Sequence, residues 1–293
     1  MGLECSYCLI EGNASGGPNK VVRFGRFLRK SDQSLIQRYR CTYCKKSFSQ
    51  ASTDLFFNQR KREYNSRIAL LLVSGVSQRR AALILGINRK TLVKKFILLG
   101  FLAQYFLLDS NLGEPKADTI EFDDLETIEH TKLKPLSVTL AVEYQSRRIL
   151  GFKVSQMPAK GHLTKLSFKK YGLRKDLRRK GRRDLFTLIT PFVSERSLIK
   201  SDENPHYTKD VKEFFPESLH QVHKGRRGCV AGQGELKKIG FDPLFSLNHT
   251  CAMLRANINR LFRKTWCTTK KPERLSLHLA LYALFHNARL KAL

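Results

Sequence analysis

A pair of short helices is the first structure that the hydrophobic pattern predicts. Ser77 is a suitable N-cap for a helix whose apolar residues share one face, namely Ala81, Ala82 and Leu85. Gly86 then supplies a turn, and Asn88 caps a second helix that begins at Arg89. The second helix is expected to bury one set of residues, Leu92, Val93 and Phe96, and to expose another, Arg89, Lys90, Lys94 and Lys95. Two short helices joined by a turn that contains glycine are typical of a helix-turn-helix.

Alternation with a period of two predicts a sheet in the middle of the chain. From residue 119 to residue 124, apolar residues alternate with acidic ones, as in a half-buried strand. Residues 136–143 and 149–154 are predicted as two further strands joined by a polar turn, so an antiparallel meander opens a mixed sheet. Residues 197–202 form another strand, which leaves Asp202 at its carboxyl edge, where open α/β sheets keep their sites.

Helices are predicted to follow the central strands. Residues 163–183 form a helical stretch with ten Lys and Arg residues, either a solvated face or, in this chain, a face that follows phosphates. Residues 184–194 are also expected to be helical. Apolar residues then recur every three or four positions, as in an amphipathic helix: Leu247, Cys251, Leu254, Ile258, Leu261 and Phe262. Another face of this helix holds Asn248, Arg255 and Asn259, and a last amphipathic helix spans 275–290.

The overall charge of the chain is strongly positive. Its 293 residues include 54 Lys and Arg against 25 Asp and Glu, a net charge of +29, while 42% hydrophobic residues exclude a wholly disordered polycation. A folded protein this basic needs a polyanion, and nucleic acid is the obvious one. The charge indicates the partner and not the activity. The longest apolar stretch, residues 96–108, is shorter than the about 20 residues that a membrane span needs, so we expect a soluble, intracellular protein.

Four of the seven cysteines form two CxxC pairs: Cys5 with Cys8, and Cys41 with Cys44. Two such pairs supply four thiolates for one tetrahedral zinc ion. Residues 21–27 and 35–39 lie between the pairs and are predicted as the short strands of a zinc ribbon with an enlarged loop. The alternative is a pair of redox or incidental motifs. The other three cysteines are expected to be buried or free thiols: Cys229, Cys251 and Cys267.

Acidic residues are concentrated in one segment of this basic chain. Seven of the 25 lie between residues 114 and 129: Glu114, Asp118, Glu121, Asp123, Asp124, Glu126 and Glu129. A surface that binds nucleic acid has no reason to gather negative charge unless a cation neutralises it. Mg²⁺ takes oxygen ligands, and in two-metal nucleases and polynucleotidyl transferases it bridges the scissile phosphate. The alternative is an acidic linker, which accounts for Glu114 and Asp118 better than for residues 119–124.

The order of these motifs resembles bacterial insertion-sequence transposases of the compact insertion-sequence-one type. Proteins of that family carry an RNase H-like catalytic domain with a DDE set of metal ligands. The Phe-Asp-Asp strand and the Asp-x-x-Pro-x-Tyr turn carry the resemblance. It implies that Asp123, with Asp124 beside it, and Asp202 bind magnesium.

The third ligand of that family departs from the pattern in this chain. The family has a Glu on a later helix, with a basic residue seven positions further on. The matching positions are Asn248 and Arg255, so the Glu is replaced by Asn. An Asn carbonyl oxygen can coordinate Mg²⁺ but brings no charge. Glu235, in a glycine-rich segment, is the rival third ligand.

The resemblance implies three parts: a zinc ribbon at 1–55, a helix-turn-helix DNA-binding region at 56–110, and an RNase H-like α/β catalytic domain at 115–293 with basic helical insertions. It implies structural Zn²⁺, catalytic Mg²⁺ or Mn²⁺, a homo-oligomer on element ends and target DNA, and a place in the bacterial cytoplasm at the nucleoid, away from membranes. The function expected is that of a transposase that cleaves DNA and transfers strands. The alternatives are a catalytically inactive DNA-binding regulator derived from a transposase and an RNA-binding protein.

Overall fold

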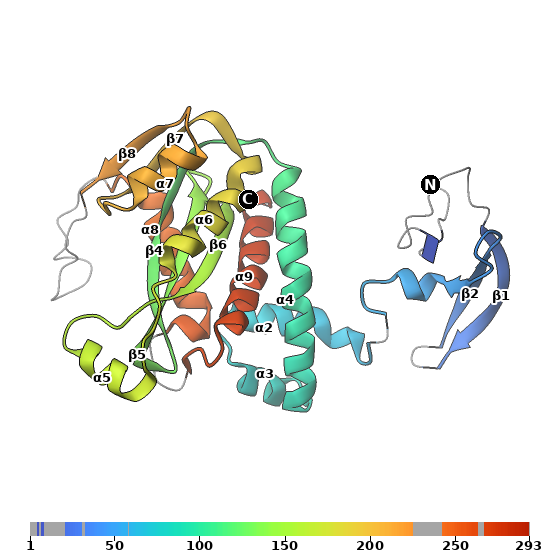
Figure 1. The fold of residues 1–293 in the computed structure, drawn as a ribbon. Coiled ribbons are helices and arrows are strands. Elements are labelled where there is room, and N and C mark those ends of the chain that lie inside the picture. The colour runs from blue at the N-terminus through green and yellow to red at the C-terminus, as the bar shows by residue number, and fades with distance from the viewer. Residues whose placement is uncertain are drawn as a thin grey trace. The chain divides into compact units, whose positions relative to one another are not determined.

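Figure 1 presents the computed structural model, which describes Cys5 and residues 7–8, 21–30, 33–57, 59–224, 242–262 and 267–292. The chain divides into two compact units, Met1–Tyr64 and Asn65–Leu293. Each unit contains a sheet of its own, with three strands in the first and five in the second among the residues described. The architecture is therefore mixed α/β.

The first unit is an antiparallel sheet in the order β1-β2-β3. β1 (Val21–Arg29) and β2 (Ser34–Cys41) form a hairpin, which confirms both strands predicted here, and β3 (Ser47–Ser49) pairs with the end of β2. Two 3-10 turns follow, η1 (Gln50–Thr53) and η2 (Arg62–Tyr64). The buried core of this unit is small and consists largely of cysteines: Cys5, Cys8, Cys41 and Phe48.

The second unit begins with three helices, α2 (Asn65–Val73), α3 (Gln78–Ile84) and α4 (Arg89–Leu112). The predicted caps are confirmed, because Ser77 accepts a hydrogen bond from the Arg80 N–H at 3.3 Å and Asn88 accepts one from the Lys90 N–H at 2.8 Å. Gly86 makes the turn between them with φ +61°, a conformation that favours glycine.

α4 is longer than the short helix that was predicted, because it takes in the whole apolar stretch 96–108. It packs along α9 (Pro272–Lys291), the last helix. The two helices come so close that a Cβ on Gly100 would lie 2.6 Å from Leu277 Cβ. Among the described helices α4 alone has the length and hydropathy of a membrane span, but its packing on α9 within an α/β unit is consistent with a soluble protein.

The five-stranded sheet has the order β6-β5-β4-β7-β8. The predicted meander is present as β4 (Ala117–Glu129), β5 (Thr131–Glu143) and β6 (Ile149–Gln156), each antiparallel to the next. β7 (Val193–Asp202) then runs parallel to β4, and β8 (Leu219–His223), which the sequence pattern did not reveal, runs parallel to β7. Only β5 therefore opposes the other four strands.

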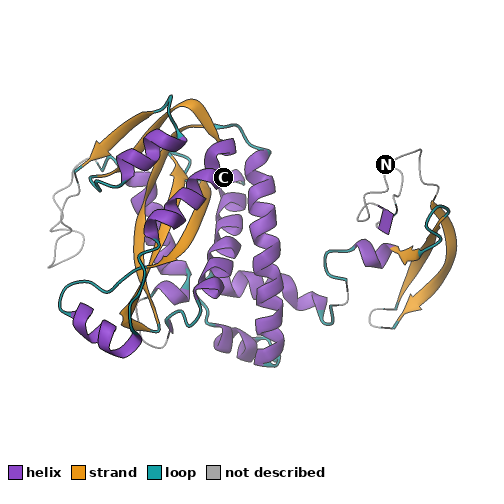
Figure 2. Ribbon diagram, in the orientation of Figure 1, coloured by secondary structure: helices purple, strands orange, loops and turns teal. Residues whose placement is uncertain are grey.

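Helices cover both faces of this sheet (Figures 1 and 2). On one face, Ile120 and Phe122 of β4 belong to the main core, which also takes in residues of α6 (Arg178–Ile189) and α7 (Tyr207–Phe214). Phe122 meets the Phe186 ring edge to face, with centroids 5.0 Å apart. α8 (Phe245–Asn257) contacts β4 and β5, and it lies on the other face, which Glu121 shares because side chains alternate along a strand.

Some predicted helix boundaries were wrong. The basic stretch 163–183 is not one helix, because α5 (Leu163–Tyr171) ends at Gly172 with φ +71° and α6 begins only at Arg178. Similarly, α8 ends at Asn257, where Ile258 turns to an extended conformation with φ −105° and ψ 104°. Asn259 consequently lies in the 3-10 turn η4 (Asn259–Leu261), buried, and not on a helix face with Asn248.

Candidate functional site

Three acidic residues meet where the parallel pairing of β4 and β7 ends. The register joins Ile120 to Ile199 and Glu121 to Lys200, and two residues further along the two strands are Asp123 and Asp202. Burial, and then the charge of Asp202, raises the pKa of Asp123 to about 7. Burial also raises the pKa of Asp202, and the charges of Asp124 and Glu203 add to this effect. The charges of the three carboxylates predicted to bind magnesium therefore act on one another, although among the described residues only the N-terminal cysteines gather their ligand atoms tightly enough to share one ion.

Hydrogen bonds fix the orientation of these carboxylates. The Tyr207 hydroxyl, at the start of α7, donates to Asp123 Oδ1 at 3.1 Å, and the backbone N–H of Asp124 donates to the same oxygen at 2.6 Å. Thr139 of β5 donates to Asp124 Oδ1. Tyr207 is itself buried against Phe122, with ring centroids 4.8 Å apart. Tyr207 is a site residue that sequence reasoning placed only inside a turn motif, without a role.

Glu121 anchors α8 to the sheet beside these carboxylates. It is fully buried, and its Oε2 accepts a hydrogen bond from the Leu247 N–H at 2.8 Å, in the first turn of the helix. Burial raises the pKa of Glu121, while the N–H groups of Leu247 and Ser246 oppose that increase. A carboxylate of β4 therefore caps the first turn of α8. This bond fixes the position of α8 relative to the strand that carries Asp123.

Of the two residues predicted for the third position, only Asn248, on α8, lies among the described residues. Asn248 is exposed, and its Nδ2 donates to Asp242 Oδ2 at 3.0 Å. One turn further on, Cys251 is close enough to Asp123 for their charges to interact, since Asp123 joins burial in raising the pKa of the thiol to about 12. The opposing charge of Arg255, another turn on, lowers it. Sequence reasoning treated Cys251 as an ordinary apolar residue, and Glu235 lies outside the described residues.

The four N-terminal cysteines form a tight cluster. Their Sγ atoms all lie within 4.8 Å of one another, with Cys5 and Cys44 at 3.6 Å and Cys8 and Cys41 at 3.8 Å. A tetrahedral zinc ion with Zn–S bonds of about 2.3 Å needs sulfur atoms about 3.8 Å apart. The donor set and its spacing therefore fit a metal such as zinc.

The electrostatics of the cluster also favour a cation. Burial, assisted by the neighbouring thiols, raises the pKa of Cys8 to about 12. Burial acts on Cys41 in the same direction, but the N–H groups of Cys44 and Tyr43 outweigh it and lower the pKa of Cys41 to about 7. Four crowded sulfurs cannot all ionise at neutral pH unless a bound cation compensates their charge.

A basic surface surrounds the turn between α3 and α4. Arg89, Lys90 and Lys94 are exposed, as predicted. The expectation for Lys95 was wrong: its side chain is only 4% exposed, and its Nζ donates to Asn65 Oδ1 of α2 at 2.8 Å. Lys95 follows the buried Leu92 by three positions, which places it on the inner side of the helix.

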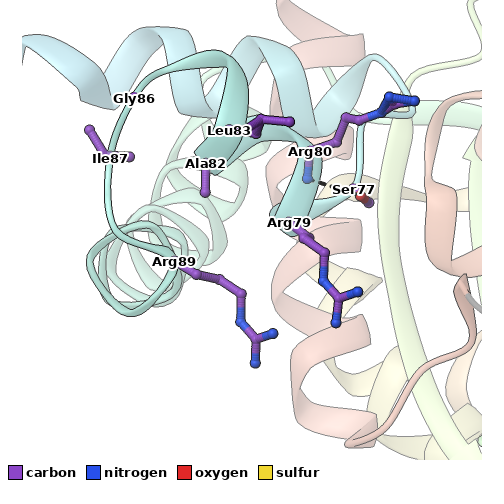
Figure 3. Close-up of a pocket in the computed structure, with 8 residues that line it drawn as sticks. All are labelled: Ser77, Arg79, Arg80, Ala82, Leu83, Gly86, Ile87 and Arg89. Carbon is purple, nitrogen blue, oxygen red and sulfur yellow. Dashed lines mark hydrogen bonds between the residues drawn. The ribbon is translucent and has the colours of Figure 1, made fainter.

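Arginines surround a hollow in this surface, shown in Figure 3. Its lining residues are Ser77, Arg79, Arg80, Ala82, Leu83, Gly86, Ile87 and Arg89. The side chains of Arg79 and Arg89 extend in the same direction from α3 and from the start of α4, whereas Arg80 points away (Figure 3). Arg79 was missed by sequence reasoning, because a lone basic residue on a first helix gives no signal of its own.

No protein-family model matches this chain, and no curated protein matches it either.

Proposed function

We propose that the protein is a DNA transposase of the insertion-sequence-one type, working as a homo-oligomer on element ends and target DNA. The observation that carries the proposal is the pair of Asp123 and Asp202, held side by side on β4 and β7 with Asp124 next to them. In a chain with a net charge of +29, a cluster of half-buried carboxylates is costly unless it serves a cation.

The strand order supports an RNase H-like catalytic unit. β4, which carries Asp123, is the central strand, and β7, which ends at Asp202, is its parallel neighbour. Only β5 opposes the other strands, as expected for an RNase H-like sheet. α8 lies against β4, which is where the resemblance expects the helix that carries the third ligand.

Carboxylate oxygens are the ligands that Mg²⁺ and Mn²⁺ prefer in proteins. Asp123, Asp124 and Asp202 would hold Mg²⁺ or Mn²⁺, which would supply Lewis-acid activation of the nucleophile and of the leaving oxygen. Tyr207 keeps Asp123 oriented through its hydrogen bond. In hydrolysis a water oxygen forms a bond to phosphorus and the bond to the 3′ oxygen breaks. The freed 3′ hydroxyl then attacks target DNA in the same way.

The third position rests on Asn248 or Glu235, with Arg255 as the phosphate-binding residue. Arg255 lies on α8 one turn beyond Cys251. The charges of Asp123 and of Arg255 both act on the Cys251 thiol, so Arg255 lies near the acidic cluster. A guanidinium there would neutralise the charge of the scissile phosphate. The capping by Glu121 keeps this helix in place.

DNA ends would be recognised by the helices of the second unit, and the first unit would be held together by zinc. Arg89, Lys90 and Lys94 lie on the exposed side of α4 at its N-terminal end, as a helix that enters a groove requires. Arg79 would add a phosphate contact from α3.

The decisive experiment is a cleavage and strand-transfer assay on the DNA that flanks the gene, with Mg²⁺ or Mn²⁺. Asp202→Asn should lower product formation at least about a hundredfold, because one metal ligand loses its charge. The matched control is Asp118→Asn, which changes an exposed carboxylate of the same sheet that accepts a hydrogen bond from Ser194. Strand transfer by Asp202→Asn at the level of the wild type would contradict the proposal.

One observation favours a second candidate, a DNA-binding regulator without catalysis. The family's third acid is replaced by Asn248, whose side chain is already engaged with Asp242. Tight binding to the flanking DNA, with no products from either the wild type or Asp202→Asn, would select this candidate.

A further inference from the structure

One face of the β1–β2 hairpin leaves aromatic rings uncovered. The alternation along β2 turns Tyr39 and Cys41 towards the cysteine cluster and turns Arg38 and Arg40 to the opposite face. On that opposite face Val22 pairs with Arg40, and Phe27 pairs with Ile36. The side chains of Val22, Phe24 and Phe27 are 41–46% exposed. The face of the hairpin that is turned away from the cysteine cluster therefore exposes apolar side chains to solvent.

Arginines flank the central ring of this face. The guanidinium carbons of Arg38 and Arg40 lie 5.3 Å and 5.4 Å from the centroid of the Phe24 ring. These cation–π contacts restrict the ring while leaving it accessible. The platform is thus a half-exposed phenyl ring with two guanidinium groups beside it, an arrangement that combines a stacking surface with positive charge.

The backbone beneath Phe24 is held in a fixed shape. A bulge places Phe24 and Gly25 opposite a single residue of β2, and Gly25 adopts φ +71°. The Gln37 side chain locks the bulge, since its Nε2 donates to Gly25 O at 2.8 Å and its Oε1 accepts from Arg26 Nε at 3.0 Å. The ring is therefore presented without a loss of loop entropy on binding.

The charge of the hairpin selects a polyanion. β1 and β2 together contain five arginines and not one acidic residue. An apolar protein partner would meet these charges at a desolvation cost, whereas a nucleic acid would pair its phosphates with them. Exposed aromatic rings add a preference for bases that are free to leave a duplex and stack.

We propose that the Phe24 face of the hairpin, formed by Val22, Phe24, Phe27, Arg38 and Arg40, binds single-stranded DNA by stacking an unpaired base on Phe24. The two flanking arginines contact the adjacent phosphates. This activity belongs to the first unit and does not depend on the acidic cluster of the second. For a protein that opens DNA ends, such a face would hold a strand that has left its partner.

The test measures the anisotropy of the full-length, zinc-loaded protein with two labelled probes, an oligo(dT) of about 20 nucleotides and a random-sequence duplex of the same length. Phe24→Ala should weaken binding to oligo(dT) about tenfold and change binding to the duplex less than about twofold. Phe24→Trp should bind oligo(dT) at least as well as the wild type. Phe24→Leu, which keeps apolar bulk without a flat ring, should behave as Phe24→Ala.

The matched control is Leu35→Ala. Leu35 is also an exposed apolar residue of the hairpin, at 60%, but it lies on the opposite face, opposite Leu28. Leu35→Ala should bind both probes as the wild type does. The zinc content of every variant should equal that of the wild type. The proposal is overturned if Phe24→Leu binds oligo(dT) normally, if Phe24→Ala weakens both probes equally, or if it weakens neither. Because the readout is binding alone, its failure is distinguishable from a failure of DNA cleavage.

Discussion

The four thiols of the first unit and the three carboxylates of the second both crowd together groups that repel one another when ionised, but in different settings. The cysteines are themselves most of the buried core of the first unit, which they form together with Phe48. The carboxylates lie at the margin of a core that is complete without them, built from Phe122, Phe186 and their neighbours. The difference teaches that zinc would be part of what folds the first unit, whereas the ion proposed for the carboxylates would be a reagent held by a unit that folds without it.

The largest effect is expected when the thiol cluster is broken. Cys41→Ser should reduce bound zinc from one ion per chain to none and expose residues 21–57 to proteolysis, because binding of structural zinc contributes about 10–16 kcal/mol to such small units. The second unit should stay resistant to protease. Zinc determination and limited proteolysis check both expectations.

Cys267→Ser is the control for that experiment, since Cys267 belongs to the second unit and is not one of the four clustered cysteines. It should retain a full complement of zinc. If Cys41→Ser also retained it, the cluster would not be a metal site, and the contrast between the two units would disappear.

A smaller effect is expected from the core behind the carboxylates. Phe122→Ala should lower the free energy of unfolding of the second unit by about 3–5 kcal/mol, because it removes a fully buried ring between Phe186 and Tyr207. Urea denaturation followed by circular dichroism measures this loss. Zinc content should not change.

The comparison variant is Phe101→Ala, at a ring of α4 that is 58% exposed. It should cost less than about 0.5 kcal/mol. Loss of zinc together with the sheet in Phe122→Ala would show that the two units fold as one, and would contradict the contrast.

The smallest effect is expected from acid acting on the second unit alone. Burial, and then the charge of Arg260, lowers the pKa of His278 from 6.5 to about 4, and its Nε2 donates to Leu72 O at 2.8 Å. A depressed pKa means that the unfolded state binds the proton more readily, so stability falls as the pH drops from 6.5 to 4. His278→Gln should remove at most about 3 kcal/mol of that pH dependence.

Urea denaturation of the wild type and His278→Gln at both pH values provides the measurement. His206→Gln, at an exposed histidine, should leave the pH dependence as it is. If the free energy of unfolding fell equally between the two pH values in His278→Gln and in the wild type, acid would act on another group of the unit.

The caps and turns of the first helices could be predicted because their causes are local. Ser77 and Asn88 each satisfy an N–H two or three residues away, and Gly86 adopts the conformation that its own residue type favours. Each CxxC pair could be recognised for the same reason, because its two cysteines are only three positions apart. Lys95 was misplaced although its spacing from Leu92 puts it on the inner side of the helix, because the partner that its buried ammonium needs, Asn65, lies 30 residues earlier on another helix.

The acidic cluster could be predicted only in part. Asp123 and Asp202 were found through motifs, but nothing local to α8 indicates that the thiol of Cys251 lies close enough to Asp123 for their charges to interact. That depends on Glu121 capping the helix from 126 residues away in sequence. β8 was missed since its five residues, with Leu219 and Val222 exposed at the edge of the sheet, show no alternation of burial.

The length of α4 has a mechanical consequence. At 24 residues it is a rod of about 36 Å, whose first residue, Arg89, lies at the basic surface and whose C-cap, Gly113, is four residues before β4. The close contact between Gly100 and Leu277 prevents it from sliding along α9. Because the helix is continuous from Arg89 to Leu112, a force applied at Arg89 is transmitted along its whole length, to a point just before the strand that carries Asp123.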